Sequence, residues 1–283
     1  MSRLSAANRH ALLIGINAYP HVRPLRGCVN DARAMRALLV DRFGFPDSNV
    51  RLLLDADATR EGILAEMDAL VERAGEDDVV VMFYAGHGSQ MTDRENDEPD
   101  GMDETIVAFD SGRGEHPNRD ITDDEIHAKL VLLGRKTPHV TLIFDSCHSG
   151  TIARDAFGDM GRSIPADERP PEELPPSLVD PLLAQGGHRG IGPSGWLPIG
   201  PTYLLMAGCR SDQSAYEHTV REGGEEVVHG AFTYFLAREL ADAHPGKHVP
   251  GRLRARGATC HGGQGAPAPP DGGYAQPGAV RGR

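Results

Sequence analysis

The sequence predicts an α/β fold in which a mostly parallel sheet is flanked by helices on both faces. Segments of strand character alternate with segments of helical period, and this order favours right-handed crossovers between parallel strands. The segment 79–84 is an unbroken apolar run, which is typical of a strand covered on both faces. The 283 residues could form one large domain or two small ones, and length alone favours neither.

The first part of the chain is expected to hold three strands separated by two helices. Apolar residues recur at a helical spacing between Asn30 and Phe43, and Gly44 is a suitable stop. Thr59 opens the second helix, which Gly75 follows. The expected strands are 10–16, 49–54 and 79–84, and the expected helices are 30–43 and a segment that begins at Thr59.

The next part of the chain continues this pattern with less regularity. Thr122 is a suitable N-cap for a helix whose inward face carries Ile126, Leu130 and Leu133. The expected elements are a short strand or ribbon at 105–109, this helix at 122–133, strands at 140–144 and 202–209, and a closing helix at 230–243.

Composition predicts the domain organisation. Residues 1–9 are expected to form an N-terminal arm and residues 10–244 a single domain. The stretch 155–201 is rich in proline, glycine and charge and is too long for an ordinary connection, so we predict a functional or flexible loop. Residues 245–283 are so rich in Gly and Pro that we predict a disordered tail.

Charge and cysteine content narrow the range of functions. The net charge of −12 argues against non-specific binding to nucleic acid or to an anionic membrane surface. The four cysteines form no C-x-x-C pair, which argues against a disulfide framework or a structural zinc site. No apolar run has the length of a signal-peptide core or a transmembrane helix. We therefore expect a cytoplasmic setting in which a thiol stays reduced. We also expect a monomer.

Two strands end in turns that carry a reactive side chain. The run 79–84 leads into Gly86-His87-Gly88, and the run 140–144 leads into Asp145-Ser146-Cys147-His148-Ser149-Gly150. In a parallel sheet both turns lie at the same edge, where open α/β folds place their chemistry. An imidazole beside a thiol is the usual means of obtaining a thiolate near neutral pH. We therefore predict a cysteine nucleophile enzyme.

The roles follow from this placement. Cys147 is the predicted nucleophile and His87 the residue that assists it, while the backbone amides of Gly88 and Cys147 are predicted to form an oxyanion hole. The alternatives are a buried structural thiol for Cys147 and an ordinary turn residue for His87. His148 is interpreted as a turn or surface histidine, because adjacent side chains usually diverge.

Five segments of the sequence resemble the metacaspases, the caspase-like cysteine peptidases of bacteria, plants, fungi and protists. They are 11–17 (ALLIGIN), 25–32 (LRGCVNDA), 84–90 (YAGHGSQ), 145–150 (DSCHSG) and 207–217 (AGCRSDQSAYE). The segments follow the family's order and jointly are specific, and they favour a bacterial-type member. The resemblance implies a caspase-like fold and an endopeptidase with a His87–Cys147 dyad that works through an acyl-enzyme.

The resemblance also implies protein or peptide substrates that are cut after Arg or Lys. Asp145 lies two positions before Cys147, so both side chains face the same way on a strand, and a carboxylate there suits a basic substrate side chain. By the resemblance, Asp31 is a second acidic wall, with Cys28 nearby. The alternatives are a cap or first-turn acid for Asp31 and a structural role for Asp145. Ala85 stands where some members have Ser.

Acidic clusters raise the question of a cation. The residues 93–104 do not fit an EF-hand, because Val107 falls where Glu is needed. By the resemblance, calcium would be bound by Asp103, Asp123 and Asp124. A fourth ligand would fall at Arg154, which mismatches the family, although Asp155 is adjacent. We expect calcium stimulation, with a solvated acidic face or helix N-terminal charge as the alternative.

The long loop 155–201 and its edge contain arginines, which an enzyme that cleaves after Arg or Lys could cut. Self-processing is common in the family, and the candidate positions are Arg154, Arg162, Arg169 and Arg189. A passive surface insertion is the alternative for this loop.

Two other classes of protein remain open for the whole chain. One is a caspase-like scaffold or interaction module with weak or absent peptidase activity, which the irregular composition after Ala243 favours. The other is a different cysteine acyl-transfer enzyme such as an amidase, which would need the dyad but not two acidic pocket walls.

Overall fold

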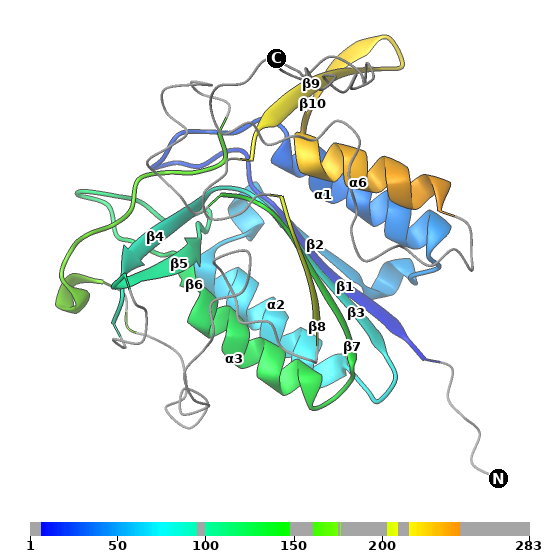
Figure 1. The fold of residues 1–283 in the computed structure, drawn as a ribbon, viewed down its shortest axis with the longest axis horizontal. Coiled ribbons are helices and arrows are strands. Elements are labelled where there is room, and N and C mark those ends of the chain that lie inside the picture. The colour runs from blue at the N-terminus through cyan, green and yellow to red at the C-terminus, as the bar shows by residue number, and fades with distance from the viewer. Residues whose placement is uncertain are drawn as a thin grey trace, which may run out of the picture.

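The computed structural model describes residues 7–94, 100–147, 161–174, 176, 203–208 and 215–243. At its centre lies a five-stranded sheet in the order β2-β1-β3-β7-β8, in which every neighbouring pair is parallel (Figure 1). The strands are β1 (Arg9–Gly15), β2 (Val50–Leu54), β3 (Val79–Ala85), β7 (His139–Asp145) and β8 (Tyr203–Ala207). The predicted α/β class with a mostly parallel sheet is confirmed.

Helices cover both faces of this sheet (Figure 1). The helices α1 (Cys28–Ala37) and α6 (Ala231–Asp242) lie on one face, and α2 (Arg60–Arg73) and α3 (Asp123–Gly134) lie on the other. Because β1 is flanked by β2 and β3, the strand order reverses there, and the carboxyl ends of β1 and β3 form a topological switch point. Open α/β folds bind ligands at such a point.

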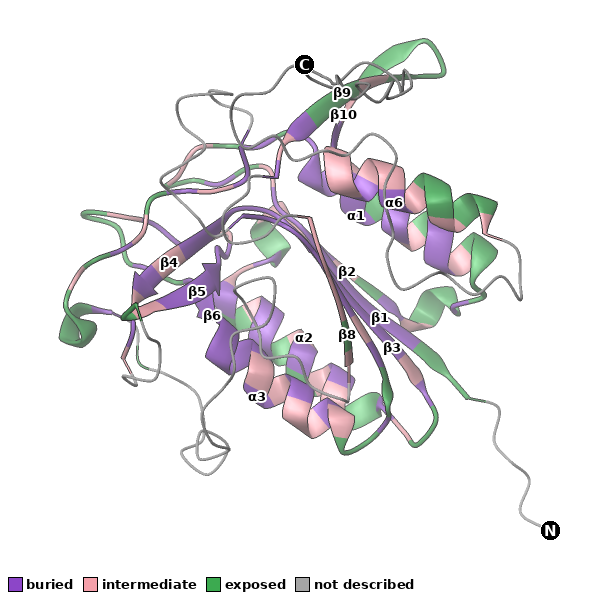
Figure 2. Ribbon diagram, in the orientation of Figure 1, coloured by how far each residue is buried: buried purple, intermediate pink, exposed green. Residues whose placement is uncertain are grey.

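The hydrophobic core lies between the sheet and the helices on its two faces. Figure 2 shows the central strands of the sheet as buried along most of their length. Leu12 and Leu13 of β1, Val80 of β3 and Leu142 of β7 are fully excluded from solvent. Apolar burial on both faces is what the unbroken hydrophobic runs predicted, and it holds the carboxyl ends of these strands rigidly in place.

The helix ends follow local rules. Thr59 caps α2 by accepting from the amide of Gly62, and Thr122 forms a capping box with Glu125 at the start of α3. The helix predicted at 30–43 begins at Cys28 and widens after Ala37 into a π-helical turn, Leu38–Arg42. Short 3-10 turns occur at Asp47–Asn49, Asp55–Asp57 and Pro171–Glu173.

Two small sheets were not predicted. One is antiparallel and contains β4 (Gly88–Thr92), β5 (Met102–Ile106) and β6 (Ile121–Thr122), so the ribbon expected at 105–109 begins earlier and is part of this sheet. The other is a hairpin of β9 (Glu217–Glu222) and β10 (Glu225–Gly230). These strands are short and polar, so they lack the hydrophobic period by which strands are recognised.

Within the ranges described above, no helix has the length and apolar character needed to cross a membrane.

Candidate active site

His87 follows β3 and is held in place by two buried tyrosines. The Tyr84 hydroxyl donates to the carbonyl oxygen of His87 at 2.7 Å, and the His87 amide donates to the Tyr19 hydroxyl oxygen at 3.0 Å. A Cβ atom on Gly86 would overlap both hydroxyls, so glycine is required there. The Gly86-His87-Gly88 turn therefore has a structural reason for its first glycine.

The imidazole of His87 is fully buried and has a defined tautomer. Its Nε2 lies 2.7 Å from the carbonyl oxygen of Arg23. Because a carbonyl can only accept, Nε2 carries the hydrogen and the neutral ring keeps a lone pair on Nδ1. Nδ1 has no hydrogen-bond partner among the described residues. Burial lowers the pKa of His87 to about 3, and nearby arginines act in the same direction. The ring is thus neutral near pH 7.

This lowered pKa predicts how stability depends on pH. Between its usual value of 6.5 and about 3, His87 binds a proton in the unfolded chain but not in the folded one. The unfolded state then holds more protons, so stability contributed by His87 is present above pH 6.5 and is lost as the pH falls. We expect the free energy of unfolding to fall by up to about 1.4 kcal/mol per pH unit from this group.

Denaturant titrations from pH 7 to pH 4 measure the effect, with Cys147→Ala in both proteins to prevent self-cleavage. The slope of the unfolding free energy against pH is compared between the protein that retains His87 and the variant His87→Gln. Equal slopes of the unfolding free energy against pH would contradict a buried, neutral His87.

Cys147 lies two positions after the end of β7 and is buried. Its Sγ accepts a hydrogen bond from the amide of Ala215, with the nitrogen 2.7 Å from the sulfur. This hydrogen bond holds the sulfur in position beyond the end of β7. In Cys28, burial raises the pKa of the thiol well above its usual value. Of these two cysteines, Cys147 is therefore the one suited to act as a nucleophile.

The two amides predicted to form an oxyanion hole converge on one carbonyl oxygen of the chain itself. Gly88 N and Cys147 N donate to the carbonyl oxygen of Arg162, at 3.0 and 3.1 Å. The amide of Arg162 in turn donates to the carbonyl oxygen of Ala215 at 3.0 Å. The backbone at Arg162 therefore lies across the end of the sheet, held on both sides. Two amides on one carbonyl oxygen are able to stabilise negative charge that develops there.

The side chain of Arg162 is fully buried among carboxylates. Its Nη2 lies 2.6 Å from Asp31 Oδ2, and its Nη1 lies 3.2 Å from Asp145 Oδ2. A third carboxylate, that of Glu217, is 3.7 Å from Nη2. Asp31 and Asp145, which were expected to line one pocket, both contact the guanidinium of Arg162.

Other groups fix these carboxylates in position. Asp145 Oδ2 accepts from the amide of Thr233 at 3.0 Å and from its hydroxyl at 2.6 Å. Glu217 accepts from the amides of Arg26 and Gly27. Burial raises the pKa of Asp145, although Arg162 opposes the rise. The guanidinium thus lies among carboxylates that backbone and side-chain donors hold in position.

His229 is a further residue at the pocket that the sequence analysis missed. Its Nδ1 lies 2.8 Å from Asp31 Oδ1, and this hydrogen bond raises the pKa of His229. Asp31 also accepts from the amide of Gly230 at 2.8 Å. The N-cap of α1 is Gly27, so Asp31 is not the helix cap, but it does lie in the first turn of α1, as the other alternative expected. Glu217 was missed as well, although it ends one of the segments compared with the family.

Two glycines make room for the guanidinium. A Cβ atom on Gly230 would overlap Arg162 Nη1 and Asp145 Oδ2. A Cβ atom on Gly27 would lie 2.9 Å from the backbone carbonyl carbon of His229 and 3.0 Å from both Arg162 Nη2 and Glu217 Oε1. No hydrophobic period marks these positions, so their role follows only from the three-dimensional arrangement. The pocket is therefore shaped as well as charged for a planar cation.

The residues predicted to bind calcium lie at one end of the small antiparallel sheet. Asp103 is on β5, and Asp123 and Asp124 are in the first turn of α3; all three are buried. Thr105 of β5 pairs with Thr122 of β6 in antiparallel register. The residues before Thr105 and those after Thr122 therefore lie at the same end of the small sheet. Among the described residues, no group of three His, Cys, Asp or Glu side chains is arranged to hold a metal ion. Calcium binding stays a prediction.

The candidates for self-processing differ in where they lie. Arg162 is in the acidic pocket, whereas the guanidinium of Arg169 binds the carboxylate of Asp167, with Nε 2.8 Å from Oδ1. Arg154 and Arg189 lie outside the described residues, as does Asp155. Of the described candidates, only Arg162 has its side chain in the pocket and its carbonyl oxygen between the two amides.

The chain is similar to known proteins of one family. The family model described as "Metacaspase, peptidase C14 domain" matches residues 9–155. The chain is similar to Metacaspase-1A of Aspergillus oryzae, with 41% identity over 149 residues that cover 50% of this chain and 35% of the relative. It is also similar to Metacaspase-6 of Arabidopsis thaliana, with 38% identity over 161 residues that cover 55% of this chain and 42% of the relative.

A solved structure gives a further likeness. The crystal structure of a Geobacter sulfurreducens protein matches with a TM-score of 0.53 and 28% sequence identity, covering 82% of this chain and 81% of that one. The chain spans only 35% and 42% of the lengths of the two curated relatives named above.

Proposed function

This chain belongs to the metacaspase family, and we propose that it is a cysteine endopeptidase that cleaves after Arg or Lys, with its own Arg162–Ser163 bond as one substrate. The observation that carries the proposal is the position of Arg162. Its carbonyl oxygen lies between the amides of Gly88 and Cys147, while its side chain lies between Asp31 and Asp145. The segment is bound as a substrate would be.

The two amides hold the carbonyl oxygen of Arg162, and the proposed reaction brings Cys147 and His87 to this carbonyl group. Cys147 Sγ attacks the carbonyl carbon of Arg162, and His87 Nδ1 takes the thiol proton. The negative charge on the carbonyl oxygen is stabilised by the amides of Gly88 and Cys147. The C–N bond to Ser163 then breaks as His87 returns the proton to the leaving amine. Water hydrolyses the resulting thioester, which frees the thiol and leaves Arg162 as a new carboxyl terminus.

The charge of the pocket explains the expected specificity. Buried carboxylates must be compensated by a cation, and the guanidinium of Arg162 meets two of them with separate nitrogens. The ammonium of Lys carries the same charge on a single nitrogen, so we expect Lys to be accepted less well than Arg. An acidic side chain would add negative charge to the pocket and be excluded.

Fluorogenic peptides ending in Arg, Lys or Asp test the proposal, with the Cys147→Ala variant as the control. We expect cleavage in the order Arg, then Lys, and none after Asp. Folded wild-type protein that cleaves none of them would favour the scaffold alternative. Cleavage after Asp would contradict the assignment of the pocket.

Calcium stimulation is proposed from the family resemblance and the acidic residues Asp103, Asp123 and Asp124. We expect a chelator such as EGTA to lower the rate on the Arg peptide at least tenfold, and added calcium to restore it. Because hard cations prefer carboxylate oxygens, Asp123→Asn should raise the calcium concentration needed for half-maximal rate. If the chelator leaves the rate on the Arg peptide unchanged, the calcium proposal is contradicted. The proposed specificity for Arg and Lys would not be affected by that result.

Substituting Gly230 with alanine is expected to impair the pocket. The added methyl group would overlap the substrate guanidinium and Asp145 Oδ2, so we expect kcat/KM for the Arg peptide to fall about 10- to 100-fold. The matched control is Gly75→Ala, where the added Cβ meets only the Asp78 side chain, at 3.3 Å or more. A Gly230→Ala enzyme as active as this control would contradict the pocket assignment.

A further inference from the structure

The backbone pairing around Arg162 continues towards the C-terminus along β4. The bonds are Ile164 N to Gly88 O at 3.1 Å, Asp167 N to Gln90 O at 2.8 Å and Thr92 N to Asp167 O at 3.1 Å. They place the segment 163–167 parallel to β4, which is an edge strand of the order β4-β5-β6. Adding a strand to a sheet edge is a common way for proteins to bind extended peptides.

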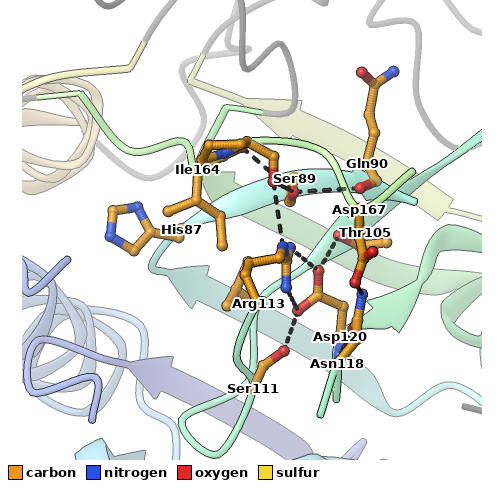
Figure 3. A network of polar contacts seen from close by, with 12 residues as sticks. His87, Ser89, Gln90, Thr105, Ser111, Arg113, Asn118, Asp120, Ile164 and Asp167 are labelled. Carbon is orange, nitrogen blue, oxygen red and sulfur yellow. Dashed lines mark hydrogen bonds and ion pairs between the residues drawn. The ribbon is translucent and has the colours of Figure 1, made fainter. Parts of the chain in front are cut away.

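The added strand bulges in its middle. Ser163 is bridged to Gly88 and Asp167 to Met91, so five residues of the segment face four of β4. At the bulge, the carbonyl oxygen of Pro165 accepts from Ser89 Oγ at 2.9 Å and from Arg113 Nε at 3.3 Å. The two donor residues, Ser89 and Arg113, are labelled in Figure 3. Side chains thus replace the regular backbone pairing at this position.

Arg113 is positioned for this contact by a buried carboxylate. Its Nη2 lies 2.6 Å from Asp120 Oδ2 (Figure 3). Asp120 is fully buried and also accepts from the hydroxyls of Thr105, at 2.9 Å, and Ser111, at 2.5 Å. The carboxylate therefore fixes the guanidinium, and the guanidinium reaches the backbone of the added strand.

Two side chains of the added strand are buried, and each meets a different environment. Ile164 is 5% exposed and belongs to the hydrophobic core cluster, whereas the neighbouring Pro165 is exposed. Asp167 is 5% exposed, and its Oδ2 accepts from Asn118 Nδ2 at 3.0 Å. Asn118 is itself 4% exposed, with its Oδ1 accepting from the amide of Asp120 at 2.7 Å.

The carboxylate of Asp167 is ionised. Although burial opposes it, hydrogen bonds from Arg169 and Asn118 lower the pKa of Asp167 to about 2. The Oδ1 atom of Asn118 already accepts a hydrogen bond from the amide of Asp120. The side-chain NH₂ group of Asn118 can only donate, so it binds a hydrogen-bond acceptor, here the carboxylate of Asp167.

We propose that the edge of β4, together with Ser89, Arg113 and Asn118, is a binding site for the substrate residues that follow the scissile bond. The substrates it fits are extended segments with an aliphatic residue second after the bond and a carboxylate fifth after it. In the uncut chain, Ile164 and Asp167 occupy these two positions. The inference rests on the proposed function, because the positions are counted from the bond after Arg162.

Internally quenched peptides test this site on the self-processed full chain. The parent peptide is Gly-Arg-Ser-Ile-Pro-Ala-Asp-Glu. One altered peptide has Asn in place of its Asp, and another has Ser in place of its Ile. We expect kcat/KM to fall about tenfold for the first, which loses a charge-assisted hydrogen bond, and at least tenfold for the second, which loses apolar burial. An Arg-aminocoumarin reporter, which has no residues after the bond, reports peptidase activity separately.

The variant Asn118→Ala identifies the residue that recognises the acid. The ratio of kcat/KM for the Asp peptide to that for the Asn peptide should fall from about ten to about one. This ratio is taken within one enzyme, so it does not depend on the fraction of the variant that folds, and the wild-type ratio alone tests the site. Equal rates on all three peptides by an enzyme that cleaves the reporter would overturn the inference and leave the proposed function standing. Failure to cleave the reporter or any peptide would overturn both.

Discussion

Substituting Cys147 with alanine is expected to abolish both self-cleavage and cleavage of Arg peptides, with a loss of at least about 10⁴-fold in rate. The variant retains the amides that hold the carbonyl oxygen of Arg162 but has no nucleophile to attack the carbonyl carbon. Rates on the Arg peptide and gel analysis of the purified chain over time measure the two activities.

The conservative variant Cys147→Ser is the matched control for this loss. It keeps an acceptor for the amide of Ala215, but its hydroxyl does not ionise near neutral pH, so we expect it to be inactive as well. Thermal unfolding shows whether both variants are folded. Self-cleavage that persists in purified Cys147→Ala would show that another group is the nucleophile.

Substituting Asp31 with asparagine is expected to have the second largest effect, and to change both catalysis and stability. The change removes one of the carboxylates around the buried guanidinium of Arg162. Breaking a buried ion pair costs about 3–5 kcal/mol, so the uncut chain should lose stability of this order. In processed enzyme, kcat/KM for Arg peptides should fall at least about 100-fold for the same reason.

A double-mutant cycle separates these contributions in the Cys147→Ala background. Asp31→Asn and Arg162→Met are measured singly and together by denaturant unfolding. Because the double variant leaves no unpaired buried guanidinium, it should be several kcal/mol more stable than the sum of the single losses predicts. As a control, Asp47→Asn removes a partner of Arg36 at an exposed pair and should change stability by less than about 1 kcal/mol. Additive losses at Asp31 and Arg162 would contradict the pairing.

Hydrophobic runs predicted the main sheet because its strands are buried on both faces. The strands at 79–84 and 140–144 appear almost as expected, as β3 and β7, and so do the turns that hold His87 and Cys147. Residues at strand ends can be predicted in this way, because strand order and direction fix where they meet. Asp145 was expected in the pocket because it lies two positions before Cys147, where two strand residues face the same way. In the structure β7 ends at Asp145, so Cys147 lies beyond the strand.

The remaining parts of the site depend on contacts between distant segments. His229 and Glu217 reach Arg162 and Asp31 through a polar hairpin that lacks a hydrophobic period. The hairpin does have a local signal in Gly223 and Gly224, whose φ angles of +60° and +94° are those of a tight turn, and the sequence analysis did not use it. The choice among candidate arginines depends on the path of a long loop, which composition cannot predict.

The central claim is that the Arg162–Ser163 bond lies in the active site of a cysteine peptidase. Mass spectrometry of the purified wild-type chain, with the Cys147→Ala chain beside it, tests this most directly. We predict a fragment that ends at Arg162 and a new amino terminus at Ser163 in the wild type, and an intact chain in the variant. Cleavage of the wild type at Arg169 or elsewhere, with the Arg162–Ser163 bond intact, would contradict the account.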